Sequence, residues 1–532
     1  MAPPSWHAEL VRRGPHTEAG RRRSGVGLGW ICATTGAALL LAGCGGLQGP
    51  QTVAPPGTYS AAKGSSTTTS TTSTTQPALP VTPITWTPCN GDLQCGTLIV
   101  PLDYSRPQGA TIGIAVARHL AEEPTDRVGS LVINPGGPGV SGIDDFTNEL
   151  DSLTPGLLDD FDIVTFDPRG VQRSDPVTCG ETPGATPGPV PDPIPQTAAE
   201  EQSIIANMRQ FGADCEKASG TVLPYVGTVD VARDLDRLRQ ALGDSGLTYM
   251  GQSYGTLLGV TYAQLFPTHI RAMVLDSVID PALSFSQMTL GQAEGFEGVL
   301  DSFFTWCAGT SACQWRPAGD PTTALLAQIA KSRTEPMPAG NGRSAGPGEF
   351  YNALLDGLYS ESDWDTLGAA LAADAAGNGA PIVAMSDHYS MDGSTNGADA
   401  AQAIDCLDHP STKHLGSYGQ LAASFAASAP VFGPLLAWGE ASCAVWPVAP
   451  TRTPAPVSAP GSPPVLVIGT TRDPATPYAW AVSVAAQLRH GDLLTVDGSD
   501  HVSYFYSPCV RAYVQTYLID LTTPPVGATC SD

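Results

Sequence analysis

The stretch LTYMGQSYG, residues 247–255, joins an apolar run to a helix-like segment, residues 256–266. A serine at a sharp turn between a strand and a helix holds a strained backbone, so the positions two residues before and after it favour glycine. Gly251 and Gly255 occupy these positions around Ser253. The stretch therefore predicts a nucleophile elbow, which exposes the Ser253 hydroxyl at the end of a parallel strand.

Short, continuous apolar runs on both sides of this elbow predict further strands of the same sheet. They are residues 130–134, 161–166, 271–276, 464–468 and 492–496. Strands that are buried on both faces have this pattern. Residues 229–242 and 479–488 predict helices between them, and residues 96–104 and 111–119 predict an antiparallel hairpin. We therefore expect an α/β fold, with a mostly parallel central sheet and helices on both faces.

The same pattern divides the folded part of the chain into three segments. Residues 85–282 and 457–532 contain the predicted strands, and we expect them to form one α/β-hydrolase core. Residues 283–456 consist instead of Ala-rich helical stretches and loops. Because strands from both sides are needed to complete one sheet, this middle segment is expected to be an inserted, mainly helical cap.

The N-terminal residues predict export. Arginines precede an apolar run in residues 1–43, as in a signal peptide, and the run ends in Leu-Ala-Gly-Cys44. This ending resembles the bacterial lipobox, so we expect a lipid anchor on Cys44; the alternative is an ordinary signal peptide in which Cys44 has no role. The Ser/Thr/Pro-rich residues 44–84 predict a disordered spacer. We expect an exported protein of the cell envelope, either lipid-anchored on the outer face of the plasma membrane or released.

Charge and cysteine content limit the partners of the protein. The chain has 26 basic and 51 acidic residues, a net charge of −25, which argues against binding nucleic acid. Its cysteines lack the spacing of a zinc site, and no metal or organic cofactor is expected. The oligomeric state stays open.

Ten cysteines follow Cys44, an even number that fits an oxidising compartment. Pairing neighbours along the chain gives the disulfides Cys89–Cys95, Cys179–Cys215, Cys307–Cys313, Cys406–Cys443 and Cys509–Cys530.

Two residues after the elbow have the chemistry needed to activate Ser253. A serine hydroxyl requires a general base, and the base requires an acid that fixes its orientation. In elbow folds the acid and then the base follow the serine in the chain. Asp473 comes after the apolar run 464–468, and His501 comes after the run 492–496. We expect Asp473 to orient His501, and His501 to take the proton of Ser253.

Backbone N–H groups are expected to stabilise the oxyanion. The residue after the nucleophile, Tyr254, supplies one of them. The sequence Asn-Pro-Gly-Gly137-Pro-Gly follows an early strand, and Gly137 is our second donor. Arg169, in the sequence Asp-Pro-Arg-Gly after the next strand, is interpreted as a structural residue that ties loops together by hydrogen bonds.

Taken in order, these motifs resemble the exported tripeptidyl aminopeptidase family of high-GC bacteria. The resemblance rests on residues 134–139, 167–170, 249–263, 274–281 and 469–477, and it extends over about residues 85–530. Members are α/β-hydrolases related to prolyl aminopeptidases, with the acid and the base in a carboxyl-terminal segment. The resemblance implies a serine exopeptidase that forms an acyl-enzyme on Ser253 and cleaves peptides near a free N-terminus. The base loop, Gly-Ser-Asp-His501, departs from the Gly-x-Gly-His form common in relatives, and the cap carries the fewest recognisable motifs.

Two other functions stay open at this point. A cell-envelope carboxylesterase acting on acyl esters or lipids would use the same catalytic groups. An exopeptidase needs acceptors for the substrate ammonium, and the cap residues Glu294, Glu297 and Asp301 are candidates, with a solvated helix face as the alternative. A non-enzymatic envelope lipoprotein is disfavoured, because the serine, the acid and the base are all present.

Overall fold

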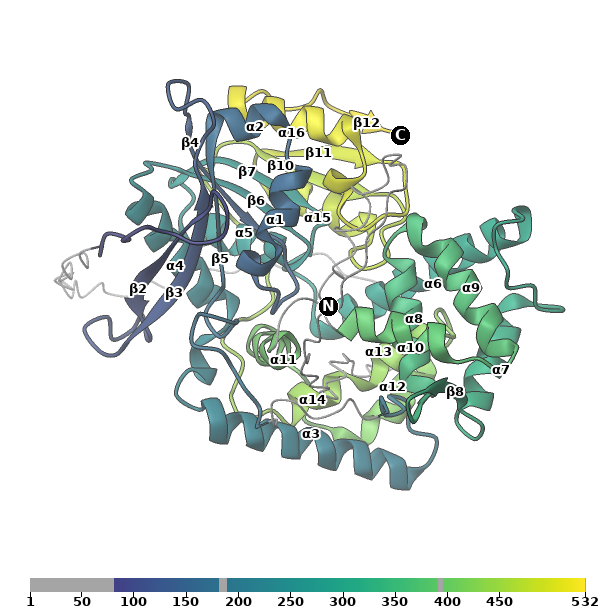
Figure 1. Ribbon diagram of the computed structural model, residues 1–532. Coiled ribbons are helices and arrows are strands. Elements are labelled where there is room, and N and C mark those ends of the chain that lie inside the picture. Colours follow the sequence, from purple (N-terminus) through teal and green to yellow (C-terminus); the bar gives the residue numbers. More distant parts are fainter. Residues whose placement is uncertain (1–80, 181–188, 391–395, 532) are drawn as a thin grey trace, which may run out of the picture.

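The computed structural model describes residues 81–180, 189–390 and 396–531 (Figure 1). The predicted signal peptide, Cys44 and most of the predicted spacer lie outside these residues. Within them the chain forms a part built around a sheet and a part built from helices, side by side (Figure 1). None of the helices in the described ranges combines the length and the apolar character that a bilayer span requires.

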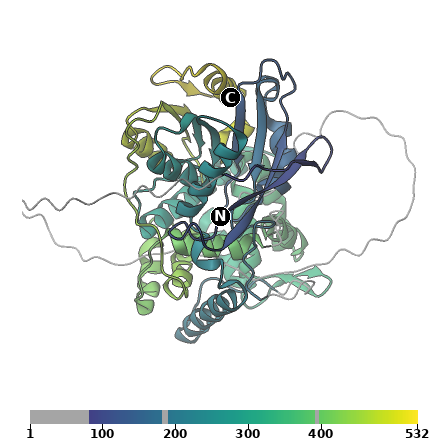
Figure 2. The same ribbon diagram turned by 90° about the vertical axis from the view of Figure 1, so that its left-hand side faces the viewer.

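A ten-stranded sheet forms the centre of the first part. Its order is β1-β2-β3-β5-β4-β6-β7-β10-β11-β12. The strands are β1 (Thr87–Pro88), β2 (Gln94–Pro101), β3 (Thr111–His119), β4 (Gly129–Asn134), β5 (Phe161–Phe166), β6 (Leu247–Gln252), β7 (Ile270–Asp276), β10 (Val465–Thr470), β11 (Gly491–Val496) and β12 (Thr529–Cys530). The predicted hairpin of β2 and β3 is antiparallel, and Figure 2 shows it at the edge of the sheet nearest the viewer. From β5 to β12 all neighbours are parallel, which confirms the mostly parallel sheet.

Helices cover both faces of this sheet, which explains the continuous apolar runs. Every residue of β4, β5, β6 and β10 is buried. Alternate side chains of β10 enter two different cores: Val465 and Val467 pack with one set of helices, and Leu466 and Ile468 with another. The first set is α4 (Thr228–Leu242), α5 (Tyr254–Leu265) and α15 (Tyr478–Gln487), and the second is α1 (Gly142–Ser152), α2 (Pro155–Asp160) and α16 (Pro508–Asp520).

The inserted cap is mainly helical and has a hydrophobic core of its own, with Phe296, Phe303 and Trp364 among its members. Its helices are α6 (Phe285–Gly309), α7 (Pro321–Ser332), α8 (Pro347–Leu358), α9 (Trp364–Ala375), α10 (Ala380–Ser390), α11 (Gly397–Asp408), α12 (Tyr418–Phe425), α13 (Phe432–Trp438) and α14 (Glu440–Ala444). A short hairpin of β8 (Met337–Gly340) and β9 (Arg343–Ala345) interrupts them. No pattern in the sequence predicted this hairpin.

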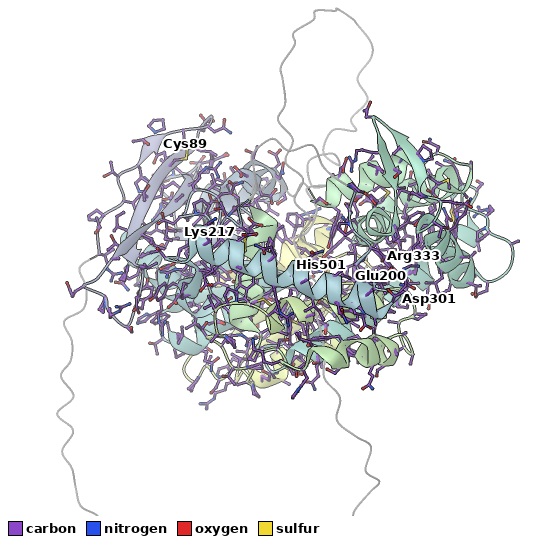
Figure 3. All side chains as sticks on the ribbon, turned by 90° about the horizontal axis from the view of Figure 1, so that it is seen from below. Cys89, Glu200, Lys217, Asp301, Arg333 and His501 are labelled. Carbon is purple, nitrogen blue, oxygen red and sulfur yellow. A yellow bond between two sulfur atoms is a disulfide. The ribbon has the colours of Figure 1, made fainter. Side chains whose placement is uncertain are left out.

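One segment within residues 85–282 packs on the cap as well as on the sheet core. It leads into α3 (Ala198–Ser219), which packs against α14. Before this helix, Asp192 pairs with Arg333 of the cap at 2.7 Å, and the Val190 N–H donates to Glu349 at 2.8 Å. Figure 3 shows α3 running between the labelled residues Lys217 and Glu200 across both parts of the molecule. The helix therefore helps to hold the cap against the sheet.

Five disulfides form, and they join the same pairs that the sequence analysis expected. Two of them close short loops, Cys89–Cys95 and Cys307–Cys313. The other three fasten separate elements to one another. Among these, Cys406–Cys443 joins α11 to α14 within the cap.

Candidate active site

Ser253 lies at the turn between β6 and α5, with the backbone geometry of a nucleophile elbow. Its φ is 52° and its ψ is −122°, a conformation that side chains rarely adopt. A Cβ on Gly251 would lie 2.4 Å from the Gly255 carbonyl oxygen, and a Cβ on Gly255 would lie 2.6 Å from the Asn134 carbonyl oxygen. Both positions therefore require glycine, for the reason that the sequence analysis gave.

The ends of four parallel strands meet at this turn. Gln252 pairs with Asp276, so the next residues, Ser253 and Ser277, leave the sheet side by side. Asp276 pairs in turn with Ile468 of β10, and β10 pairs with β11 along its whole length. The loops that carry Asp473 and His501 therefore begin at the same edge of the sheet as the elbow.

Asp473 and His501 are in direct contact. The carboxylate Oδ1 of Asp473 lies 2.8 Å from Nδ1 of His501, and both side chains are fully buried. The backbone and hydroxyl of Thr476 also donate to this carboxylate, at 2.8 and 2.9 Å. Burial alone would raise the pKa of Asp473, but His501 and the hydrogen bonds outweigh it and hold the pKa below its usual value. The group is therefore an ionised acid, suited to orient an imidazole.

Ser277 connects the acid loop to the base loop; it lies in the stretch 274–281 that carries the family resemblance, but the sequence analysis gave it no role. Its hydroxyl donates to Oδ2 of Asp473 at 2.6 Å and accepts the Val502 N–H at 2.8 Å. The neighbouring Asp276 carbonyl accepts the Ser253 N–H at 3.0 Å. The end of β7 thus fastens the loops of all three predicted catalytic residues. Only the pairing of β6 with β7 could have indicated the role of Ser277, and the sequence of either strand alone does not reveal this pairing.

The second ring nitrogen of His501 is buried, and none of the described residues forms a hydrogen bond with it. The structure therefore brings Asp473 and His501 together but forms no hydrogen bond between His501 and Ser253. The cap holds the base loop from the other side. The Tyr359 carbonyl accepts the His501 N–H at 3.0 Å, and the Tyr359 ring meets the imidazole edge-on at 5.3 Å between centroids.

A pocket opens beside Ser253. Gly137 and Tyr254, the two predicted oxyanion donors, both line it. The loop that carries Gly137 lies directly against the elbow, because a Cβ on Gly136 would come within 3.1 Å of the Tyr254 nitrogen. Hence the predicted nucleophile and both predicted backbone donors share one pocket. In the ranges that the structure describes, no group of three His, Cys, Asp or Glu side chains could hold a metal ion.

Comparison with known proteins relates the chain to one family and to several named relatives. Residues 429–530 match the family described as TAP-like protein. The chain is 37% identical over 481 residues to serine protease Hip1 of Mycobacterium tuberculosis, covering 84% of this chain and 90% of that protein. It is 33% identical over 467 residues to the tripeptidyl aminopeptidase of Streptomyces lividans, covering 84% and 86%.

The chain belongs to the tripeptidyl aminopeptidase family of α/β-hydrolases. The resemblance noted in the sequence is therefore confirmed, and the protein is a hydrolase. It is also 33% identical over 465 residues to carboxylesterase B of Mycobacterium tuberculosis, covering 82% of this chain and 86% of that protein. Related proteins thus carry both peptidase and esterase names.

The three cap acids that we considered as acceptors for a substrate ammonium do not line the pocket. Glu294 and Asp301 are exposed on α6, in agreement with a solvated helix face. Figure 3 labels Asp301 on the cap and His501 in a different part of the molecule. Glu297 is buried, and its carboxylate accepts the Val431 and Phe432 N–H groups at 3.1 and 3.2 Å, at the start of α13. It therefore caps a helix.

Arg169 has the structural role expected from the sequence. Its side chain is fully buried, and two of its nitrogens donate to Asp234 at 2.6 Å. The remaining donors reach the backbone oxygens of Pro101, Leu102 and Tyr225 at 3.0–3.1 Å. This one guanidinium therefore holds together the end of β2, the loop after β5 and helix α4.

Proposed function

We propose that this protein is a serine exopeptidase that cleaves peptides near their free N-terminus through an acyl-enzyme on Ser253. The observation that carries the proposal is the contact of 2.8 Å between Asp473 and His501, at the sheet edge that also presents Ser253. Relatives named serine protease and tripeptidyl aminopeptidase support the same chemistry.

The proposed mechanism assigns a role to each of these groups. Because Asp473 is ionised and binds Nδ1 of His501, the proton sits on Nδ1 and Nε2 is the free base. Nε2 takes the proton of the Ser253 hydroxyl as its oxygen attacks the substrate carbonyl. The backbone N–H groups of Tyr254 and Gly137 stabilise the resulting oxyanion. His501 then protonates the leaving amine, and a water molecule hydrolyses the acyl-enzyme by the same route.

The hydrogen bond between Ser253 and His501 is expected to form when substrate binds. Catalytic hydrogen bonds are often long in enzymes without substrate and shorten in the reactive complex. The unpartnered Nε2 of His501 is consistent with this, because a buried ring nitrogen without a partner is unfavourable unless substrate or the serine satisfies it.

We further propose that the protein is exported and anchored through a lipid on Cys44. Five disulfides in the described ranges favour an oxidising compartment. Mass spectrometry of the mature N-terminus tests this proposal, since an acylated cysteine at residue 44 is expected. A mature chain that begins elsewhere would contradict it.

A carboxylesterase is the second candidate, favoured by the similarity to carboxylesterase B. A panel of tripeptidyl amides, single aminoacyl amides and p-nitrophenyl acyl esters separates the two. We expect cleavage of peptide amides, loss of turnover and of fluorophosphonate labelling in Ser253→Ala, and unchanged folding by circular dichroism. Hydrolysis of esters alone would reject the peptidase, and labelling that survives in the variant would reject Ser253 as nucleophile.

A further inference from the structure

The cap supplies part of the pocket that contains Ser253. Gln292 comes from α6, and Asp405 and His409 come from the C-terminal end of α11 and the residue that follows it. Figure 1 shows α11 between the sheet and the other cap helices. These three side chains give the pocket a polar region beside the nucleophile, and we call them the acceptor site.

Asp405 is the one carboxylate among the described residues that line this pocket. It is only 8% exposed, burial and the charge of Asp408 raise its pKa to about 6, and no hydrogen bond to its carboxylate is found among the described residues. The neighbouring acid, Asp408, is satisfied, because its oxygens accept the Thr228 N–H at 3.0 Å and the Thr228 hydroxyl. Buried carboxylates are normally paired with a donor or a cation. Among the described residues Asp405 therefore has no hydrogen-bond donor, and a cationic group in the pocket could supply one.

The other two members, Gln292 and His409, carry no charge of their own. Nε2 of Gln292 donates to the Ala475 carbonyl at 3.1 Å, which leaves the buried Oε1 without a partner in the described residues. His409 is buried, and its pKa is lowered well below the usual value by burial and by the charge of Arg452. Its imidazole is therefore neutral at pH 7. No lysine or arginine belongs to the described lining of the pocket.

We propose that Asp405, together with Oε1 of Gln292, binds the α-ammonium group of the substrate peptide. An ammonium has three N–H donors and no acceptor, so it matches a carboxylate and an amide oxygen beside a neutral ring. This inference rests on the proposed exopeptidase function and assigns its substrate recognition to residues of α6 and α11.

The test compares a peptide amide that has a free N-terminus with the same peptide acetylated at its N-terminus. Full-length wild-type protein should prefer the free peptide by about 100-fold in kcat/KM, since loss of one partner of a buried charge pair costs a few kcal/mol. Asp405→Asn should reduce this preference to below about tenfold. Asp405→Glu, which keeps the charge, should retain the preference for the free amine. Glu294→Gln removes an exposed carboxylate from α6 outside the pocket and should keep the wild-type ratio.

A binding measurement separates this proposal from the proposed function. In the Ser253→Ala background, isothermal titration calorimetry should show tighter binding of a free tripeptide than of its acetylated form, and Asp405→Asn should weaken only the former by at least tenfold. If peptides bind in this way but the wild-type protein cleaves esters alone, the ammonium site stands and the exopeptidase fails. If Asp405→Asn keeps the full discrimination in both assays, or if acetylation has no effect on wild type, the ammonium site is rejected.

Discussion

At the scale of single residues, Ser277 does the most to bring the acid and base loops together. It is fully buried at the end of β7, and its hydroxyl contacts both the Asp473 carboxylate and the Val502 N–H. Its φ is 60°, in the left-handed region that favours glycine. Ser277 contacts Asp473 and the base loop but not the nucleophile, so its hydroxyl has a positioning role.

We predict that Ser277→Ala lowers kcat by about 10- to 100-fold with little change in KM, because hydrogen bonds to charged groups contribute about 1.5–3 kcal/mol. Steady-state kinetics on a peptide amide checks this. Ser277→Gly is the matched control: it also removes the hydroxyl, but it suits the positive φ. Equal losses in both variants identify the hydroxyl as the cause. Normal activity of the glycine variant would show that only the backbone matters.

The contrast between Ser253 and Ser277 shows what the sequence could reveal at this scale. Ser253 has glycines at fixed offsets, and Asp473 and His501 follow apolar runs in the order that the fold requires, so all three could be predicted. Ser277 and Asp405 have no such local pattern. Ser277 depends on the register between β6 and β7, and Asp405 depends on how α11 packs beside the elbow. Both are results of tertiary structure.

At the scale of elements, the turn after α8 holds the base loop. The Asp500 carboxylate accepts the Ser360 hydroxyl at 2.7 Å and the Glu361 N–H at 3.0 Å. One residue later, the His501 N–H donates to the Tyr359 carbonyl at 3.0 Å. The cap therefore lines part of the pocket and also fixes the loop that carries the proposed base. The departure at Asp500 from the common form of this loop coincides with this contact.

Asp500→Ala should loosen the base loop and lower kcat by about tenfold, because two hydrogen bonds to one buried carboxylate are lost. Asp500→Asn keeps an acceptor oxygen and should recover most of the activity. Asp497→Ala is the matched control on the same loop, since Asp497 pairs with Arg472 in an exposed position and should leave kcat within about twofold. Equal kinetics for Asp500→Ala and wild type would show that the cap contact does not position the base.

The elements themselves differ in how far sequence could predict them. Strands β4, β5, β6 and β10 are buried on both faces, so their apolar runs marked them without any tertiary information. Helix α3 could not be placed in this way. Its position depends on contacts between residues far apart in the chain, such as that of Asp192, which precedes the helix, with Arg333.

At the scale of the whole molecule, the fold buries several carboxyl groups that form no ion pair with any of the described residues. Burial raises the pKa of Asp276 to about 7, of Glu297 to about 7 and of Glu440 to about 8. Asp276 lies at the end of β7, Glu297 in α6 and Glu440 in α14. The raised pKa values therefore occur in both parts of the protein. In the unfolded chain these groups lose their protons near pH 4.

This difference predicts that thermal stability falls as the pH rises through the neutral range. Between the unfolded and the folded pKa values, the folded protein holds protons that the unfolded chain has released, so raising the pH favours unfolding. Glu440 alone should cost about 2 kcal/mol between pH 6 and pH 8. We expect Tm to be several degrees lower at pH 8 than at pH 6 in differential scanning calorimetry. Glu440→Gln, which has no proton to lose, should reduce this fall, whereas exposed Glu294→Gln should leave it unchanged. A Tm that rises over this interval would mean that these carboxyl groups are ionised in the folded protein.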